Sequence, residues 1–127
     1  MMQILVAMLA LATSAGMQWE GNYTAQSKWD TGDVEIHRTR YNQLRVNLSV
    51  VAKDGCNGDL EFLAPMPKLA QLYLRPDQRE PFLAREDSDH CSITLYHVGD
   101  TLIVNEHDCS QEHGSACAFE GRYHRVK

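Results

Sequence analysis

The chain has 127 residues, of which 43% are hydrophobic and 23% charged. This is the size and composition of one globular domain, and it excludes a disordered chain and a protein with several membrane spans. Seventeen Asp and Glu residues outnumber twelve Lys and Arg residues, giving a net charge of -5. The chain therefore lacks the basic surplus of a nucleic-acid-binding protein, and its acidity suits a basic partner.

The first fifteen residues have the features of an export signal. They contain no charged side chain, and residues 4–12 form an apolar run too short to span a bilayer. Small residues follow at positions 13–15, which predicts cleavage after Ala15 and one mature domain of residues 16–127. The alternative is a buried N-terminal strand or helix. We expect a periplasmic or secreted protein with no membrane span after cleavage.

Alternation of apolar and polar residues predicts antiparallel strands along most of the chain. The first runs are residues 19–23 and 34–37, and the clearest is 44–50. A Gly- and Asn-rich turn at 54–58 precedes a run at 59–63, and 69–74 is a short strand or one helical turn. Runs at 92–98 and 101–106 are joined by Gly99-Asp100, a two-residue hairpin signal, and the last run is 119–123.

Four cysteines, at positions 56, 91, 109 and 117, lie beyond the predicted signal. An even number of cysteines in a short exported chain indicates disulfides, and four cysteines allow three pairings. We favour Cys56–Cys91, which ties a mid-chain turn to the start of a later strand. The second bond would then be Cys109–Cys117, which closes a tight loop around Gly114.

A short sequence pattern occurs at both ends of the mature chain. Residues 19–23 read WEGNY and residues 119–123 read FEGRY. Glycine in a strand permits a bend, and the aromatic residues two places away on either side can fill the core over it. Such strands at opposite chain ends suit a sheet that closes on itself, although two short matches also arise by chance. We predict an all-β, disulfide-linked antiparallel meander barrel or half-barrel of seven or eight strands, with the first and last strands paired.

Two segments are predicted loops. Residues 75–90 hold eight charges of both signs and two prolines, which indicates a solvated loop or one that binds a partner. Residues 107–116 form the second loop. The candidate partner-binding residues are Arg79, Arg85 and Asp87 in the first loop and Ser110, His113 and Ser115 in the second.

The second loop also contains residue types that bind zinc. His107, Cys109, His113 and Cys117 have ligand chemistry, but thiolate ligation requires reduced cysteines, which an oxidising compartment would pair instead. A looser site would use His107 and His113 with the nearby acidic residues Asp108 and Glu112.

Enzyme motifs are missing from the sequence. There is no GxSxG elbow, P-loop, GxGxxG or HExxH pattern. Glu20 and Glu120 would lie near each other if the end strands pair, but both alternate with the aromatic positions and are expected to face solvent. We therefore predict a protein that is not an enzyme and needs no cofactor.

The C-terminal third carries a resemblance. Its pattern is Cys91-x-Ile93-x-Leu95, then Leu102-x-Val104-x-Glu106, Cys109, His113-Gly114 and Cys117-x-Phe119-x-Gly121-x-Tyr123. With Cys56-x-Gly58 upstream and Gly21-x-Tyr23 at the start, it loosely resembles small exported bacterial β-proteins of uncharacterised function over most of the mature chain. The C-terminal layout is also loosely similar to modules in periplasmic and surface-exposed lysozyme inhibitors. The resemblance implies export, a β-barrel, disulfides and inhibition of a cell-wall hydrolase.

Two functional hypotheses follow. The first is an exported protein-binding module, acting as an inhibitor or immunity-type antagonist of a basic, lysozyme-like cell-wall hydrolase. The alternative is a periplasmic carrier or sensor that holds a small ligand in the barrel mouth or a metal in the His-rich C-terminal loop.

Overall fold

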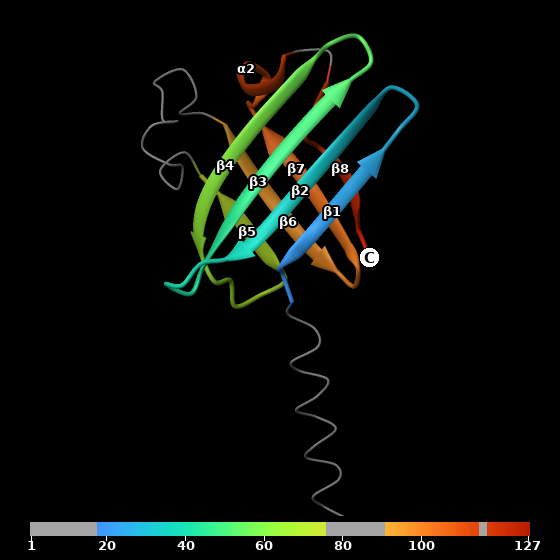
Figure 1. Cartoon of the computed structure of the whole chain (residues 1–127). Helices are drawn as coiled ribbons and strands as arrows, with labels where there is room; N and C mark the ends of the chain where they lie inside the picture. The colour runs from blue at the N-terminus through green and yellow to red at the C-terminus, as the bar shows by residue number, and fades with distance from the viewer. Residues whose placement is uncertain (1–17, 76–90, 115–116) are drawn as a thin grey trace, which may run out of the picture.

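The structure is a computed structural model that describes residues 18–75, 91–114 and 117–127 (Figure 1). The predicted signal peptide lies outside these residues. The strands are β1 (Gly21–Gln26), β2 (Asp30–Arg38), β3 (Gln43–Ala52), β4 (Asn57–Pro65), β5 (Gln71–Leu74), β6 (Ser92–Val98), β7 (Thr101–His107) and β8 (Gly121–Arg125), with a short helix α2 (Ser110–His113). Among the described residues, no helix has the length and apolar character needed to cross a membrane.

The eight strands form one antiparallel sheet that curls into a nearly closed barrel (Figure 1). The strand order is β4-β3-β2-β1-β8-β7-β6-β5, so the first and last strands pair in the middle of the sheet. The two edge strands are β4 and β5. The prediction of an all-β barrel of seven or eight strands with paired end strands is therefore confirmed, as is the hairpin at Gly99-Asp100. Of the two alternatives for residues 69–74, the strand is correct and covers Gln71–Leu74.

The barrel interior is filled by the apolar half of each alternating strand. On β3, Leu44, Val46, Leu48 and Val50 are each 1% exposed or less, while the residues between them face outward. The largest fully buried side chains are Trp19, Tyr23, Tyr123, Phe62 and Phe119. The hydrophobic effect of this single core is the main force that holds the sheet in its curled form.

The two similar five-residue patterns adopt the same local structure. The Tyr23 hydroxyl donates to the Trp19 carbonyl at 2.8 Å, and the Tyr123 hydroxyl donates to the Phe119 carbonyl at 2.7 Å. The glycine between each aromatic pair has a positive φ, 143° at Gly21, which lets the chain bend between them. The pattern is therefore a repeated structural device at the junction of β1 and β8.

Arg125 reinforces that junction, which spans only two paired residues on each strand. Its guanidinium donates to the carbonyls of Glu20 at 2.6 Å and Gln18 at 2.9 Å, and to the Tyr23 hydroxyl at 2.7 Å. It also lies 4.8 Å from the centroid of the Tyr23 ring. One side chain thus fastens the start of the described chain to its last strand.

The disulfides are Cys56–Cys117 and Cys91–Cys109, so the favoured pairing was wrong. The β6–β7 hairpin is the reason for the second bond. It pairs Ser92 with His107, and continuing this register puts Cys91 opposite Asp108. Cys109 is the next residue, and the Cα atoms of Cys91 and Cys109 are 4.5 Å apart. The β3–β4 turn then brings Cys56 to the segment that follows α2. Two disulfides indicate an oxidising, extracytoplasmic environment.

The short helix α2 was not predicted, and it packs directly on β4. A methyl group added at Gly58 would lie 2.4 Å from the Glu112 carbonyl oxygen and 2.7 Å from the Cα of His113. Glycine is therefore required at position 58 because the backbone of α2 occupies the space of a side chain.

Candidate binding surface

The structure describes only part of the predicted partner loops. Arg79, Arg85, Asp87 and Ser115 lie outside the described residues. Ser110 is exposed at the start of α2, where a partner could reach it. The partner-binding role of these residues stays a prediction.

His113 is buried, which sequence reasoning did not anticipate for a residue in a polar loop. Its Nε2 lies 2.7 Å from Oε2 of Glu106, and its Nδ1 contacts the Gly114 carbonyl. Both ring nitrogens of His113 thus meet an oxygen atom of the surrounding structure. The Phe119 ring packs edge-on at 5.0 Å. His113 in this position anchors α2 to the barrel.

The predicted zinc ligands are not gathered into a site. Cys109 and Cys117 are in different disulfides, which removes the thiolates that a zinc site would need. His107 is exposed, with its Nε2 3.2 Å from Asp108. In the described part of the chain, no group of three or more His, Cys, Asp or Glu side chains is arranged to hold a metal ion.

The mouth of the barrel offers limited space. A cavity of about 200 Å³ lies between the β1–β2 turn and the start of β8, with the inward-facing Gly32, Val50 and Tyr123 among its lining residues. Pockets for small molecules usually measure about 300–1,000 Å³. The Tyr123 hydroxyl takes the space that a side chain at position 32 would fill. This cavity is therefore smaller than a usual small-molecule site.

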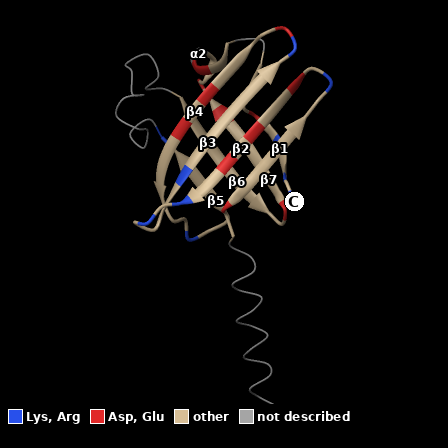
Figure 2. Cartoon of the chain, viewed as in Figure 1, with Lys and Arg blue, Asp and Glu red and all other residues tan. Residues whose placement is uncertain are grey.

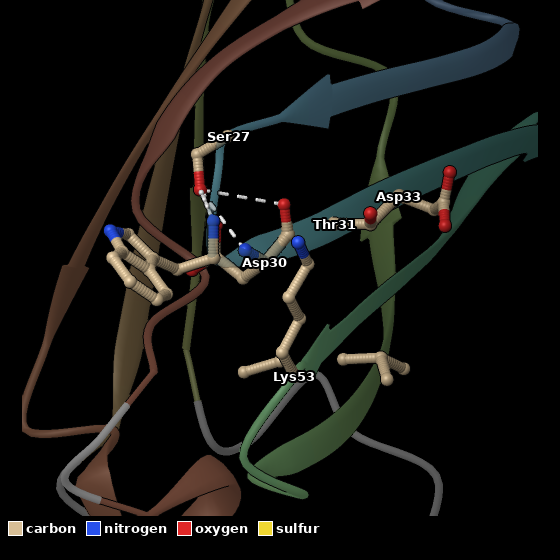
Figure 3. A pocket seen from close by; sticks show the side chains of 8 residues that line it. Ser27, Asp30, Thr31, Asp33 and Lys53 are labelled. Carbon is tan, nitrogen blue, oxygen red and sulfur yellow. Dashed lines mark hydrogen bonds between the residues drawn. The ribbon is translucent and has the colours of Figure 1, made fainter.

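A larger groove, here called the Trp29 groove, lies on the outer face of the barrel. It has a volume of about 360 Å³ and is formed by the β1–β2 turn with neighbouring parts of β2 and β3 (Figure 3). Its lining residues are Ser27, Trp29, Asp30, Thr31, Asp33, Val51, Ala52 and Lys53. None of these was a predicted site residue.

The turn that carries Trp29 is held by Ser27. The Ser27 hydroxyl oxygen accepts the N–H groups of Trp29 and Asp30, each at 3.1 Å, and the hydroxyl donates to Oδ1 of Asp30 at 2.6 Å. The Trp29 carbonyl accepts the N–H of Lys53 at 2.9 Å. The N–H and the carbonyl of Trp29 are therefore both hydrogen-bonded, although its side chain is 67% exposed.

An acidic face adjoins the groove on the outside of β2, β3 and β4 (Figure 2). The strand register places one row of outward residues at Glu35, Asn47 and Glu61, and the next at Asp33, Ser49 and Asp59. Two carboxylates on β2 thus stand opposite two on β4, with neutral residues between them.

The four carboxylates of the acidic face, Asp33, Glu35, Asp59 and Glu61, are neutralised unequally. Glu61 is paired with Arg45, and Glu35 lies 3.6 Å from His37. Asp33 and Asp59 form no ion pair with any residue in the described ranges. This face therefore keeps negative charge available to a partner.

Comparisons with protein-family models, curated proteins and solved structures each find no match to this chain. Arguments about its function consequently depend on the chemistry of its own surfaces.

Proposed function

We propose that the protein is an exported binding module that inhibits or antagonises a basic, lysozyme-like cell-wall hydrolase in the periplasm or outside the cell. The observation that carries the proposal is the acidic face, whose Asp33 and Asp59 have no basic partner in the described part of the chain. A basic enzyme surface complements this charge. The resemblance of the C-terminal third to lysozyme-inhibitor modules points in the same direction.

The fold suits such a role because it presents the charges on a rigid support. Strands β2, β3 and β4 are paired along their whole lengths, so the positions of the carboxylates are set before binding. Pre-ordering reduces the entropic cost of association. Complementary charge mainly raises the association rate and selects the partner, and its effect weakens as salt screens the charges.

The test measures inhibition of a basic c-type lysozyme and its association rate with the mature protein at increasing salt. The double variant Asp33→Asn with Asp59→Asn is expected to associate about tenfold more slowly at low salt, with the difference shrinking at high salt. The matched control is Asp100→Asn with Asp108→Asn. It removes the same charge from exposed positions bordering β7, outside the acidic face.

An equal loss of rate in the two double variants would show that net charge alone, and not the acidic face, steers the encounter. The absence of binding and inhibition across a panel of lysozymes and other basic cell-wall hydrolases would overturn the proposal itself.

A further inference from the structure

We infer that the Trp29 groove is a binding site for a neutral saccharide. This inference goes beyond the proposed hydrolase partner because it concerns a different ligand class, and the groove shares Asp33 with the acidic face. It starts from Trp29, a large aromatic side chain that is 67% exposed although the N–H and the carbonyl of its backbone are both hydrogen-bonded.

The indole of Trp29 can serve as a stacking platform. The face of an aromatic ring carries partial negative charge, and the C–H groups of one face of a pyranose ring carry partial positive charge, so the two attract and also bury apolar surface. The Ser27 hydroxyl and the Lys53 N–H fix the backbone of Trp29. Little freedom is therefore lost when a ligand covers the ring.

The rest of the groove matches the mixed character of a sugar. Val51 is 61% exposed and supplies apolar surface. Asp33 and Thr31 offer oxygen atoms, and the Lys53 side chain extends along the groove toward Asp30 (Figure 3). Sugar hydroxyls both donate and accept hydrogen bonds, so they can use carboxylates and an ammonium group at once.

The charges in and beside the groove argue against an ionic ligand. Lys53 lines the groove, and Nζ of Lys28 lies 5.5 Å from the centroid of the Trp29 ring, so a cation would meet two ammonium groups. Asp30 and Asp33 would repel an anion. A neutral polyhydroxylated molecule avoids both penalties.

The concave shape favours a small ligand over insertion of Trp29 into a protein partner. Trp29 forms part of the wall of a groove of about 360 Å³, which is within the range of small-molecule sites. On size, this volume is comparable with one or two sugar rings.

The test uses the trisaccharides of N-acetylglucosamine and of glucose as probes, with the mature protein. Trp29 is exposed whereas Trp19 is 1% exposed, so a change in tryptophan emission reports on the groove. We expect a saturable emission shift with at least one trisaccharide and a dissociation constant of about 1 mM, as for a small neutral ligand on an open surface. Two-dimensional amide NMR should show shifts at Val51 and Lys53.

Three variants locate the binding. By the NMR readout, Trp29→Ala should weaken binding at least about tenfold, and Asp33→Asn about threefold. Tyr41→Ala is the matched control because Tyr41 is 72% exposed on the β2–β3 turn and also has a neighbouring cation, Arg40, over its ring. This variant should bind like the unaltered protein.

Failure of both trisaccharides to give a saturable shift up to about 20 mM would overturn the inference, as would shifts that map away from the groove. Protection of Trp29 by a lysozyme in the absence of any saccharide response would also overturn it. That result would assign the groove to protein contact and leave the proposed function intact.

Discussion

Removing the Cys56–Cys117 disulfide should lower the free energy of unfolding, and should loosen the segment around α2 more than the sheet. The change is the double substitution Cys56→Ala with Cys117→Ala, which keeps Cys91–Cys109 and creates no free thiol. The bond joins the β3–β4 turn to the segment after α2. Within the described residues, α2 also packs on Gly58, and His113 pairs with Glu106.

The size of the effect follows from the length of chain that the bond encloses. The two cysteines are 61 residues apart in sequence. In the chain-entropy model, a loop of this length restricts the unfolded state by about 4 kcal/mol at 25 °C. Such a loss is a large share of the free energy of unfolding of a typical domain, about 5–15 kcal/mol, and corresponds to a fall in Tm of roughly 15 °C.

The assay is urea unfolding of the oxidised variant and of the unaltered protein, followed by tryptophan emission and circular dichroism. Peptide mapping under non-reducing conditions first verifies that Cys56 is linked to Cys117 in the unaltered protein. Hydrogen exchange should show faster exchange at α2 than in β2 and β3, because α2 loses its covalent anchor while the sheet keeps its ladder.

A loss of less than about 1 kcal/mol would refute the reasoning, because it would mean that the bond does not restrict the unfolded chain as its loop length requires. Mapping that linked Cys109 to Cys117 would refute the geometry from which the loop length was taken.

Three further outcomes are expected. Gly58→Ala should lower the free energy of unfolding by about 2–3 kcal/mol in urea titrations, because the added methyl group overlaps the α2 backbone. The control Gly55→Ala, whose methyl group meets nothing within 4 Å, should lower it by about 1 kcal/mol through backbone strain alone, and equal losses in the two variants would contradict this. Arg125→Met should lower the free energy of unfolding by about 2–3 kcal/mol through its lost hydrogen bonds. The control Arg122→Met, at an exposed position on the same strand, should leave the free energy of unfolding nearly unchanged, and an equally small effect of Arg125→Met would show that the junction of β1 and β8 closes without this side chain. Burial raises the pKa of Tyr123, so above pH 10 the unfolded chain loses the tyrosine proton while the folded protein retains it. The free energy of unfolding should therefore fall as pH rises above 10, and urea midpoints measured between pH 9 and 11.5 should fall less in Tyr123→Phe than in the unaltered protein.

The architecture was accessible from sequence because it depends on local pattern. The alternation over residues 44–50 fixes which side of β3 is buried, since a shift of one residue would reverse every side chain. The aromatic-Gly-Tyr pattern at both chain ends led to the prediction that the end strands pair. In the structure each tyrosine donates a hydrogen bond to the carbonyl four residues earlier, so the two patterns share one local conformation.

The disulfide pairing was missed although the sequence held a signal for it. Counting outward from the hairpin at Gly99-Asp100 pairs Val98 with Thr101 and Ser92 with His107, which puts Cys91 opposite Asp108 and within one residue of Cys109. The predicted pairing was instead chosen because a Cys109–Cys117 bond would close a short loop. Strand register is the stronger constraint, because a disulfide forms only between cysteines that the backbone has already brought together.

The candidate site was not accessible in the same way. The exposure of Trp29 depends on how one turn is closed by Ser27 and the N–H of Lys53, and such a contact across two turns leaves no periodic trace in the sequence. Likewise, His113 is buried because α2 and β7 meet in space, where Glu106 provides its partner. The acidic face emerges only when the register aligns β2 with β4 across β3.

The strand order β4-β3-β2-β1-β8-β7-β6-β5 also determines how the chain can be rewired. The end of β8 and the start of β1 lie together, since the N–H of Val126 donates to the Asn22 carbonyl at 2.8 Å. A circular permutant that links these ends and opens the chain between β4 and β5 would run through all eight strands in spatial order. Every strand pairing would then be a hairpin between sequence neighbours. In the present chain β1 pairs with β8 across nearly the whole described sequence, and such long-range pairings slow folding. The permuted chain would keep the same barrel and reach it faster.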